Sequence, residues 1–158
     1  MEHKICGWVK QNDSQYVDYH NKEWGKAIHD DNALFELFSL ETQSSGLSWL
    51  TILKKRDGYR EVFENFSLEN VSSYTQDDVN RIFESGLVIK SPPKIEAIIN
   101  NAKLFLEIKK EFGSINNYFW SKVNHKTIVN DVLDYKMACT TSEISEALAK
   151  DLKKRGFK

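Results

Sequence analysis

The sequence predicts an all-α fold, and three observations support this prediction. Apolar residues recur at intervals of three and four along most of the 158 residues. Helix-capping side chains and helix-ending glycines flank these segments. A persistent alternation of apolar and polar residues, which a half-buried strand would show, is not found. With 41% hydrophobic residues the chain can bury one compact core, so we expect a single unit over residues 1–158.

The first predicted helix begins after Asp30, whose side chain can cap a helix N-terminus. One face of this helix is formed by Leu34, Leu37, Phe38 and Glu41. Gly46 interrupts the pattern, and a second helix is predicted over residues 48–63. Glu41 therefore lies on an apolar stripe, close to the start of the next helix.

A helical hairpin is predicted over about residues 76–112. Thr75 and Asp78 form a capping-box pattern before its first helix, and Gly86 fits the position just after that helix. Pro93 suits the first position of the second helix. The local pattern is therefore helix, tight connection, helix.

Two more helices are predicted towards the C-terminus. The first is short and covers residues 115–120. The second is preceded by a capping-box pattern at Thr140 and Glu143, and Gly156 ends it. Residues 124–141 between them are the least regular part of the chain and are predicted to be a surface loop.

Charge and hydropathy limit the function classes. The 22 Lys and Arg residues balance 23 Asp and Glu residues, so any contact with nucleic acid must be local rather than driven by net charge. No apolar run is long enough to span a bilayer, and the N-terminus lacks a secretion signal. We therefore expect a cytoplasmic protein that does not bind membranes.

Glu41 is the strongest candidate for a functional residue. A carboxylate on a buried stripe is costly unless it is paired, protonated or reserved for a cationic ligand. Aromatic residues are concentrated in the first third of the chain, and the set comprises Trp8, Tyr16, Tyr19, Trp24 and Trp49. Together with Glu41 they would form a cage that stacks a planar, positively charged base. The alternatives are a glutamate on the rim of its helix and aromatic residues that only fill a core.

Two weaker patterns concern metal and phosphate. Cys6 and His20 are plausible metal ligands, but two ligands do not complete a four-coordinate zinc site and their spacing matches no zinc motif. The connection over residues 86–94 could offer backbone amides and the charges of Lys90 and Lys94 to a DNA phosphate. The alternative is an ordinary turn between two helices.

Several segments closely resemble the DNA-3-methyladenine glycosylase I family, within the helix-hairpin-helix glycosylase superfamily. They are Cys6-Gly7-Trp8, the run from Tyr16 to Gly25, the run from Leu40 to Arg56, the run from Lys94 to Ala102, Phe119 to His125, and Leu152 to Lys158. These segments occur in the family's order and cover essentially the whole chain. The resemblance implies a helix-hairpin-helix glycosylase fold in which about residues 1–30 pack with the C-terminal part.

The resemblance also implies an enzyme that removes 3-methyladenine from alkylated double-stranded DNA without lyase chemistry. Matched residue by residue, Glu41 is similar to the carboxylate that reads the base edge. Tyr19 and Trp49 are similar to the stacking walls, and Trp8, Tyr16 and Trp24 to the supporting aromatic residues. We expect a monomer that releases the free base and needs no cofactor for the chemistry.

Two features depart from the family pattern. The connection before Lys94 is less basic than usual, and Pro92 and Pro93 lack amide donors. Many members also continue beyond the Arg-Gly-Phe-Lys segment with a His and a Cys that complete a zinc site with the residues matching Cys6 and His20. We therefore expect a fold that lacks the family's C-terminal segment and holds only two of the four zinc ligands.

Two other functions stay open on the sequence. A non-catalytic helical protein could keep the damaged-base pocket and bind DNA without releasing a base. A helical interaction module could use the aromatic residues only as a core or as a surface for a partner helix. Release of free base from methylated DNA separates the first from an enzyme.

Overall fold

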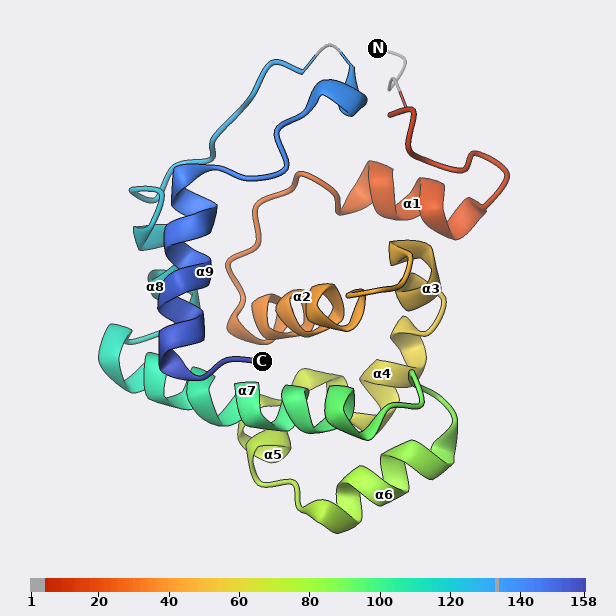
Figure 1. Cartoon of the computed structure of the whole chain (residues 1–158), viewed down its shortest axis with the longest axis vertical. Coiled ribbons are helices and arrows are strands. Elements are labelled where there is room, and N and C mark those ends of the chain that lie inside the picture. The colour runs from red at the N-terminus through yellow and green to blue at the C-terminus, as the bar shows by residue number, and fades with distance from the viewer. Residues whose placement is uncertain (1–4, 133) are drawn as a thin grey trace.

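The computed structural model describes residues 5–132 and 134–158, and Figure 1 shows its helices around a central helix, α2. The α-helices are α1 (Ser14–Lys22), α2 (Asp31–Gln43), α3 (Trp49–Leu53), α4 (Arg56–Val62), α5 (Leu68–Ser72), α6 (Gln76–Ser85), α7 (Pro92–Phe112), α8 (Ile115–Ser121) and α9 (Glu143–Arg155). Two short 3₁₀ helices are η1 (Glu64–Phe66) and η2 (Tyr135–Met137). The described residues contain no strand, which confirms the all-α prediction.

The core lies between α2 and α7. Phe35 and Leu40 of α2 and Ile98, Ala102 and Phe105 of α7 are each at most 1% exposed. The α7 residues lie on the face that the apolar periodicity predicted. In α2 the buried side chains differ from the predicted stripe of Leu34, Leu37, Phe38 and Glu41, which lines a cavity instead. Helices α5, α6 and α8 also pack against α7, so this long helix supports the others. Burying these side chains supplies the main favourable contribution to folding.

The hairpin of α6 and α7 begins and ends as the sequence predicted, with one small difference. Thr75 and Asp78 form the capping box of α6, and Gly86 follows this helix with a φ of 67°. The second helix begins at Pro92, one residue before the predicted start at Pro93. Because the first turn of a helix lacks intrahelical amide partners, two consecutive prolines are tolerated there.

Helix α4 holds the connection between α6 and α7. The Lys55 ammonium donates to the Gly86 carbonyl oxygen at 3.2 Å. The Ile89 amide donates to the Tyr59 hydroxyl at 3.3 Å. Gly58 lies so close to the connection that a Cβ atom added there would be 2.5 Å from the Leu87 carbonyl oxygen. The connection is therefore fixed against the body of the protein.

We expect Gly58→Ala to destabilise the protein because its added methyl group would meet backbone atoms that cannot rotate away. The expected loss is about 1–3 kcal/mol of the free energy of unfolding, measured by chemical denaturation. Gly25→Ala is a matched control, since its Cβ would meet no atom within 4 Å, although its φ of 71° carries its own strain. A loss at Gly58 no larger than the loss at Gly25 would contradict the close approach.

The structure differs from the predicted helices at several further places, and α5 was not predicted. Residues 48–63 form two helices, α3 and α4, with a break at Lys54 and Lys55, whereas one helix was predicted. The last helix is capped by Ser142 with Ser145, because Ser142 supplies the N-cap hydroxyl in place of Thr140. Helix α1 was not predicted at all. Its signal was Asp13, which accepts from the Tyr16 amide at 3.2 Å.

Residues 5–13 and residues 134–142 lie at the same end of the molecule (Figure 1). A Cβ added to Gly7 would be 2.7 Å from the Tyr135 ring, so the two segments are in contact. Residues 1–4 lie outside the described part of the chain. No helix among the described residues is both long and apolar enough to cross a membrane.

Candidate functional site

Glu41 faces a cavity of about 550 Å³ between α2, α8 and the segment after α1. The Asp30 side chain accepts from the Ala33 amide at 2.8 Å and so fixes the start of α2. Glu41 lies about three turns further along α2, on the same face as Leu34, Leu37 and Phe38, and this face lines the cavity. The cavity is lined by Gly25, Lys26, Ala27, Ile28, Leu34, Leu37, Phe38, Glu41, Phe119, Trp120, Val123, Thr127 and Ile128. Its lining is mostly apolar, with Glu41 as its acidic group.

The environment of the Glu41 carboxylate suits a cationic ligand. By surface area Glu41 is exposed, not buried as the apolar stripe predicted. Nearby atoms still desolvate its carboxyl group in part and raise its pKa above the ordinary value of 4.5. Among the described residues, no hydrogen bond or ion pair reaches this carboxylate. A desolvated anion without a partner gains more from a cation than an anion in water does. Glu41 therefore favours a ligand group that carries positive charge, and in the described part of the chain Lys26 is the one cation among the residues that line the cavity.

Tyr19 of α1 and Trp49 of α3 form an aromatic pair, but neither residue is among those that line the Glu41 cavity. Their ring centroids are 5.3 Å apart at an interplanar angle of 51°. Burial, together with the nearby negative charge of Glu41, raises the pKa of Tyr19 to about 12. Two rings that sandwich a base must be about 7 Å apart, twice the van der Waals spacing. A base can therefore lie between Tyr19 and Trp49 only after the two rings separate.

The indole of Trp49 has a buried Nε1–H group without a hydrogen-bond partner among the described residues. Buried polar groups are almost always satisfied, so an exception often marks a functional site. Ser48 begins α3 and accepts from the Thr51 amide at 3.2 Å, which fixes the backbone beside this indole. Two residues predicted for the pocket, Trp49 and Glu41, therefore carry polar groups without partners in the described part of the chain.

The other three predicted aromatic residues form a second cluster around His20. The Trp8 ring centroid lies 5.3 Å from that of Tyr16 and 5.4 Å from that of Trp24. His20 stacks on Trp24 with a centroid distance of 5.6 Å. None of these residues lines the cavity of Glu41, although Gly25 directly after Trp24 does. The cluster therefore packs against α1 and next to the cavity rim at Gly25, outside the cavity itself.

Cys6 and His20 lie together, as a shared metal site would require. The Cys6 amide nitrogen is 3.3 Å from His20 Nε2, and His20 Nδ1 is 2.8 Å from the Asn21 Oδ1 atom. Residues 5–132 and 134–158 contain no group of three or more side chains that could hold a metal ion. Structural zinc needs four ligands, so the residues present here do not fit a complete zinc site.

The structure separates the two lysines of the hairpin. Lys90 is exposed, and its ammonium lies 5.6 Å from the centre of the Phe83 ring. The Lys94 ammonium instead donates to the carbonyl oxygens of Gln43 and Ser45, at 2.9 and 3.1 Å. Several amides of the connection are also used within the protein, those of Leu87, Ile89 and Ser91. Lys90 is therefore the better placed of the two for a phosphate.

Comparison with known proteins identifies the family. The sequence profile of the methyladenine glycosylase family matches residues 8–158. The chain belongs to the methyladenine glycosylase family. It is 46% identical over 152 residues to the DNA-3-methyladenine glycosylase of Haemophilus influenzae, covering 96% of this chain and 82% of that protein. It is 41% identical over 153 residues to DNA-3-methyladenine glycosylase 1 of Escherichia coli, covering 97% and 81% respectively.

Solved structures of methyladenine glycosylases have the same fold. The 3-methyladenine DNA glycosylase I of Staphylococcus aureus superimposes with a TM-score of 0.90 at 39% identity, over 92% of this chain and 78% of that chain. A crystal structure of another 3-methyladenine DNA glycosylase I gives a TM-score of 0.93 at 39% identity, over 98% and 85%. These neighbours confirm the predicted glycosylase fold. The chemistry of this family needs no cofactor.

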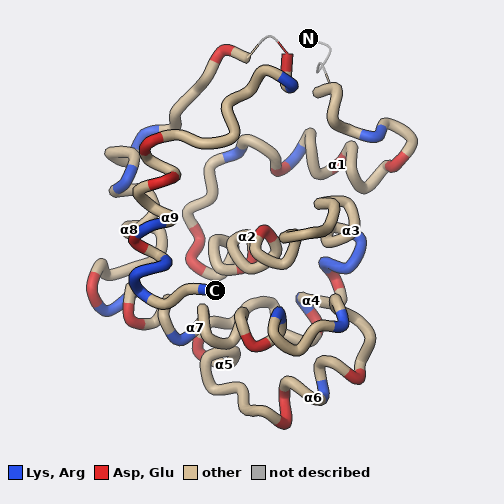
Figure 2. Tube along the Cα trace, in the orientation of Figure 1, with Lys and Arg blue, Asp and Glu red and all other residues tan. Residues whose placement is uncertain are grey.

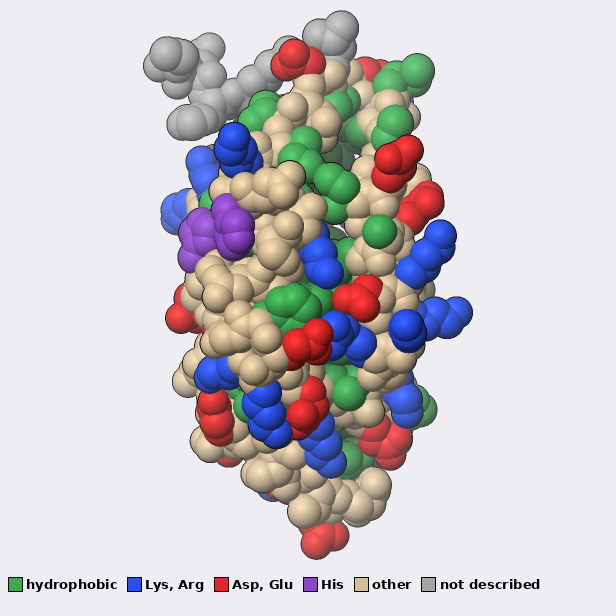
Figure 3. Space-filling model, turned by 90° about the vertical axis from the view of Figure 1, so that its left-hand side faces the viewer, with side chains coloured by type: hydrophobic (Ala, Val, Ile, Leu, Met, Phe, Trp, Pro, Cys, Tyr) green, Lys and Arg blue, Asp and Glu red, His purple; other side chains and the backbone are tan. Residues whose placement is uncertain are grey.

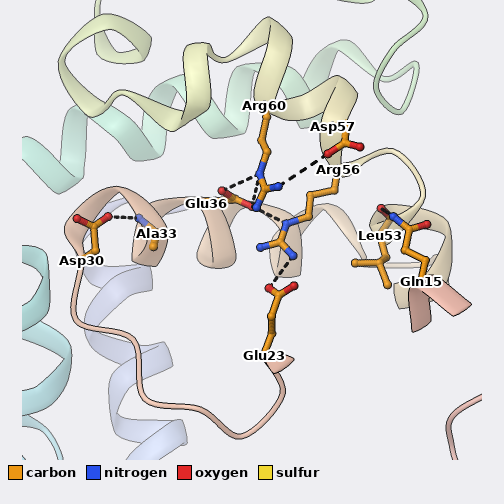
Figure 4. Close-up of polar contacts among 9 residues, drawn as sticks. All are labelled: Gln15, Glu23, Asp30, Ala33, Glu36, Leu53, Arg56, Asp57 and Arg60. Atoms are coloured by element: carbon orange, nitrogen blue, oxygen red, sulfur yellow. Dashed lines mark hydrogen bonds and ion pairs between the residues drawn. The ribbon is translucent and has the colours of Figure 1, made fainter. Parts of the chain in front are cut away.

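An ion-pair network near the pocket was missed by sequence analysis (Figure 4). Arg56 of α4 contacts Glu36 of α2 at 2.5 Å and Glu23, just after α1, at 2.6 Å. Arg60 adds a contact to Glu36 at 2.8 Å. The side chains of Arg56 and Glu36 are only 15% and 12% exposed. The sequence feature that could have predicted the network is Arg56, a charged residue on an otherwise apolar helix face.

Trp120 is a second residue of the site that the sequence did not reveal. It lines the cavity of Glu41, and its Nε1–H group donates to the Ile28 carbonyl oxygen at 2.8 Å. His29 stacks on it with a ring centroid distance of 4.5 Å. These contacts fix the orientation of the indole. No local pattern predicts that this aromatic residue of α8 lies in the same cavity as Glu41 of α2.

Charges of both signs are mixed over the molecule. Figure 2 shows Lys and Arg interspersed with Asp and Glu over the described part of the chain. Figure 3 shows the face of α8 and α9, where the two signs again lie side by side. Opposite charges within a Debye length of about 8 Å largely cancel at a distance. DNA binding must therefore depend on a few local contacts, as the charge balance predicted.

Proposed function

We propose that this chain hydrolyses the N-glycosidic bond of 3-methyladenine in alkylated double-stranded DNA, as a monofunctional base-excision repair glycosylase. The observation that carries the proposal is the Glu41 carboxylate, which has no partner among the described residues and faces a mostly apolar cavity. The Tyr19 and Trp49 rings, which contact each other but do not line this cavity, are proposed to complete the pocket when a base binds. Family membership and the names of the relatives support the substrate. The protein is proposed to act in the cytoplasm as a monomer.

Methylation at N3 gives the adenine a positive charge and makes it a good leaving group. The nucleotide leaves the duplex, and the aromatic residues and Glu41 hold the base in the pocket. Water then attacks the sugar C1′ atom while the bond from C1′ to the base nitrogen breaks. The bonding electron pair goes to the base, which leaves neutral, and the water loses a proton to solvent. No lysine attacks the sugar, so the DNA product is an abasic site in an intact strand.

The remaining site residues have supporting roles in this proposal. Trp8, Tyr16 and Trp24 support the pocket through their contacts with α1 and the segment after it. Lys90 contacts a DNA phosphate from the hairpin, because its ammonium is exposed. Cys6 and His20 join the N-terminal segment to α1, and a zinc ion would need further ligands.

The proposed function is tested by incubating the protein with methylated duplex DNA and separating the products by chromatography. We expect free 3-methyladenine in the supernatant and alkali-labile abasic sites in unbroken strands. Retention of the base in DNA that the protein nevertheless binds would favour the non-catalytic alternative. Strand cleavage without alkali would contradict the absence of lyase chemistry.

Excision is expected to depend on pH through Glu41. Desolvation raises the pKa of Glu41, so the carboxylate becomes protonated at a higher pH than an exposed glutamate does. The substrate base in DNA carries a permanent charge, so it does not titrate in the same range. The value of kcat/KM, which reports the protonation state of the free protein, should therefore fall as pH decreases, with a midpoint above 4.5. A Glu41→Gln variant should lose this dependence, and an unchanged profile would exclude Glu41 as the titrating group.

A further inference from the structure

Lys94 occupies the third position of α7, where a cation opposes the dipole of its own helix. Its ammonium reaches the C-terminal end of α2 and donates to the carbonyl oxygens of Gln43 and Ser45, at 2.9 and 3.1 Å. Carbonyl groups at a helix C-terminus lack intrahelical partners, and a cation is favourable there. Lys94 thus caps the helix that carries Glu41.

Gln43 completes the contact from the other side. It is 1% exposed, and its side-chain amide donates to the Lys94 carbonyl oxygen at 2.9 Å. Its Oε1 atom accepts from the Tyr59 hydroxyl at 3.1 Å, and that hydroxyl accepts from the Ile89 amide. Each of Lys94 and Gln43 therefore binds the backbone of the other. A series of hydrogen bonds through Gln43 and Tyr59 therefore joins the connection between α6 and α7 to the end of α2.

The segment held by Lys94 separates the two main parts of the proposed pocket. Residues 44–48 lead from the end of α2, which carries Glu41, to Ser48, the N-cap of Trp49's helix. Lys94 fixes the carbonyl groups at the start of this segment. Movement of the N-terminus of α7 would therefore change the distance between the Glu41 carboxylate and the Trp49 ring.

We propose that Lys94 is a positioning residue that couples the hairpin to the base pocket by holding residues 44–48, rather than a ligand for DNA phosphate. DNA that presses on the hairpin then acts on the pocket through this contact. The inference rests on the proposed function for its consequence in catalysis, while the contact itself does not depend on activity. This inference replaces the contact with a DNA phosphate that was predicted for Lys94, and it leaves Lys90 as the lysine of the hairpin that contacts phosphate.

The test compares Lys94→Met with Lys90→Met as a matched hairpin control and with Lys94→Arg as the conservative variant. Hydrogen exchange is measured at the amides of Ser44, Ser45 and Leu47, which donate to backbone carbonyls. Binding to duplex DNA with a stable abasic-site analogue is measured as a function of salt. Binding of free 3-methyladenine is followed by tryptophan fluorescence. If the Lys94→Met variant does not unfold cooperatively, the same measurements are made on Lys94→Gln, which is a milder substitution.

We expect Lys94→Met to accelerate exchange at residues 44–48. We also expect it to weaken the affinity for the free base about tenfold, which is the size of effect that the loss of one hydrogen bond has. Its salt slope for DNA should stay that of the wild type. Lys90→Met should reduce the slope by about 0.9 and leave exchange unchanged. Lys94→Arg should restore much of the protection because a guanidinium can donate to both carbonyl groups.

A reduced salt slope with unchanged exchange in Lys94→Met would overturn the proposal, because Lys94 would then be a phosphate ligand. Unchanged exchange with an unchanged slope would overturn it too. A wild-type protein that binds no 3-methyladenine would refute the proposed function instead. The exchange comparison would still decide whether Lys94 holds residues 44–48.

Discussion

Replacing Glu41 with Gln should slow excision of 3-methyladenine by about 10- to 100-fold, because a charge-assisted hydrogen bond to the base is lost. The amide keeps the size of the side chain and loses its charge. The affinity for free 3-methyladenine should fall in the same direction. Single-turnover base release from methylated duplex DNA and a fluorescence titration measure the two effects.

The same substitution should leave the protein at least as stable as the wild type. The Glu41 carboxylate is desolvated, and no partner for it is found in the described part of the chain, so its charge contributes nothing favourable to folding above its raised pKa. Glu107→Gln on the exposed face of α7 is the control for loss of a charge. Equal excision rates for Glu41→Gln and Glu107→Gln would remove Glu41 from the site.

Replacing Arg56 with Met should cause the largest loss of stability among the substitutions considered. The change leaves Glu36, which is 12% exposed, without its closest cation, and it also removes the contact to Glu23. Removing one partner of a buried ion pair costs about 3–5 kcal/mol, and we expect the lower value here because Arg60 still contacts Glu36. In a domain of this size the lower value corresponds to a fall in Tm of about 6–12 °C. Calorimetry measures the change.

The control for Arg56 is Lys110→Met on α7, where both partners of the ion pair are more than half exposed, at 72% and 65%. Exposed pairs contribute at most about 1 kcal/mol, so its Tm should change little. Arg56 also joins α4 to the segment after α1, which leads to the cavity rim at Gly25. Similar Tm values for the two variants would contradict the account of the network.

Local sequence patterns predicted those helices whose ends and faces are determined by residues close together in the sequence. The capping box at Thr75 and the glycine at Gly86 bounded α6 correctly because both act within one turn of chain. The apolar spacing of α2 placed Glu41 on the right face for the same reason. The break at Lys54 and Lys55 was not predictable, because the contacts of Lys55, Gly58 and Tyr59 with the distant hairpin decide the course of α4.

The pocket was predictable only in part. Glu41 stood out because one carboxylate interrupts an apolar face, and the family resemblance identified Tyr19 and Trp49. Trp120 was missed because its place in the cavity depends on a hydrogen bond to Ile28, which is 92 positions away in the chain. The separate uses of Lys90 and Lys94 were equally hidden, since both are lysines at the same turn and only the position of α2 distinguishes them.

A crystal structure of the protein with 3-methyladenine tests the central claim most directly. We predict that the base lies against the Glu41 carboxylate and that the Tyr19 and Trp49 rings have moved apart from their centroid distance of 5.3 Å to make contact with it. Electron density for the base at another site, with the Glu41 cavity empty and the two rings still in contact, would contradict the account.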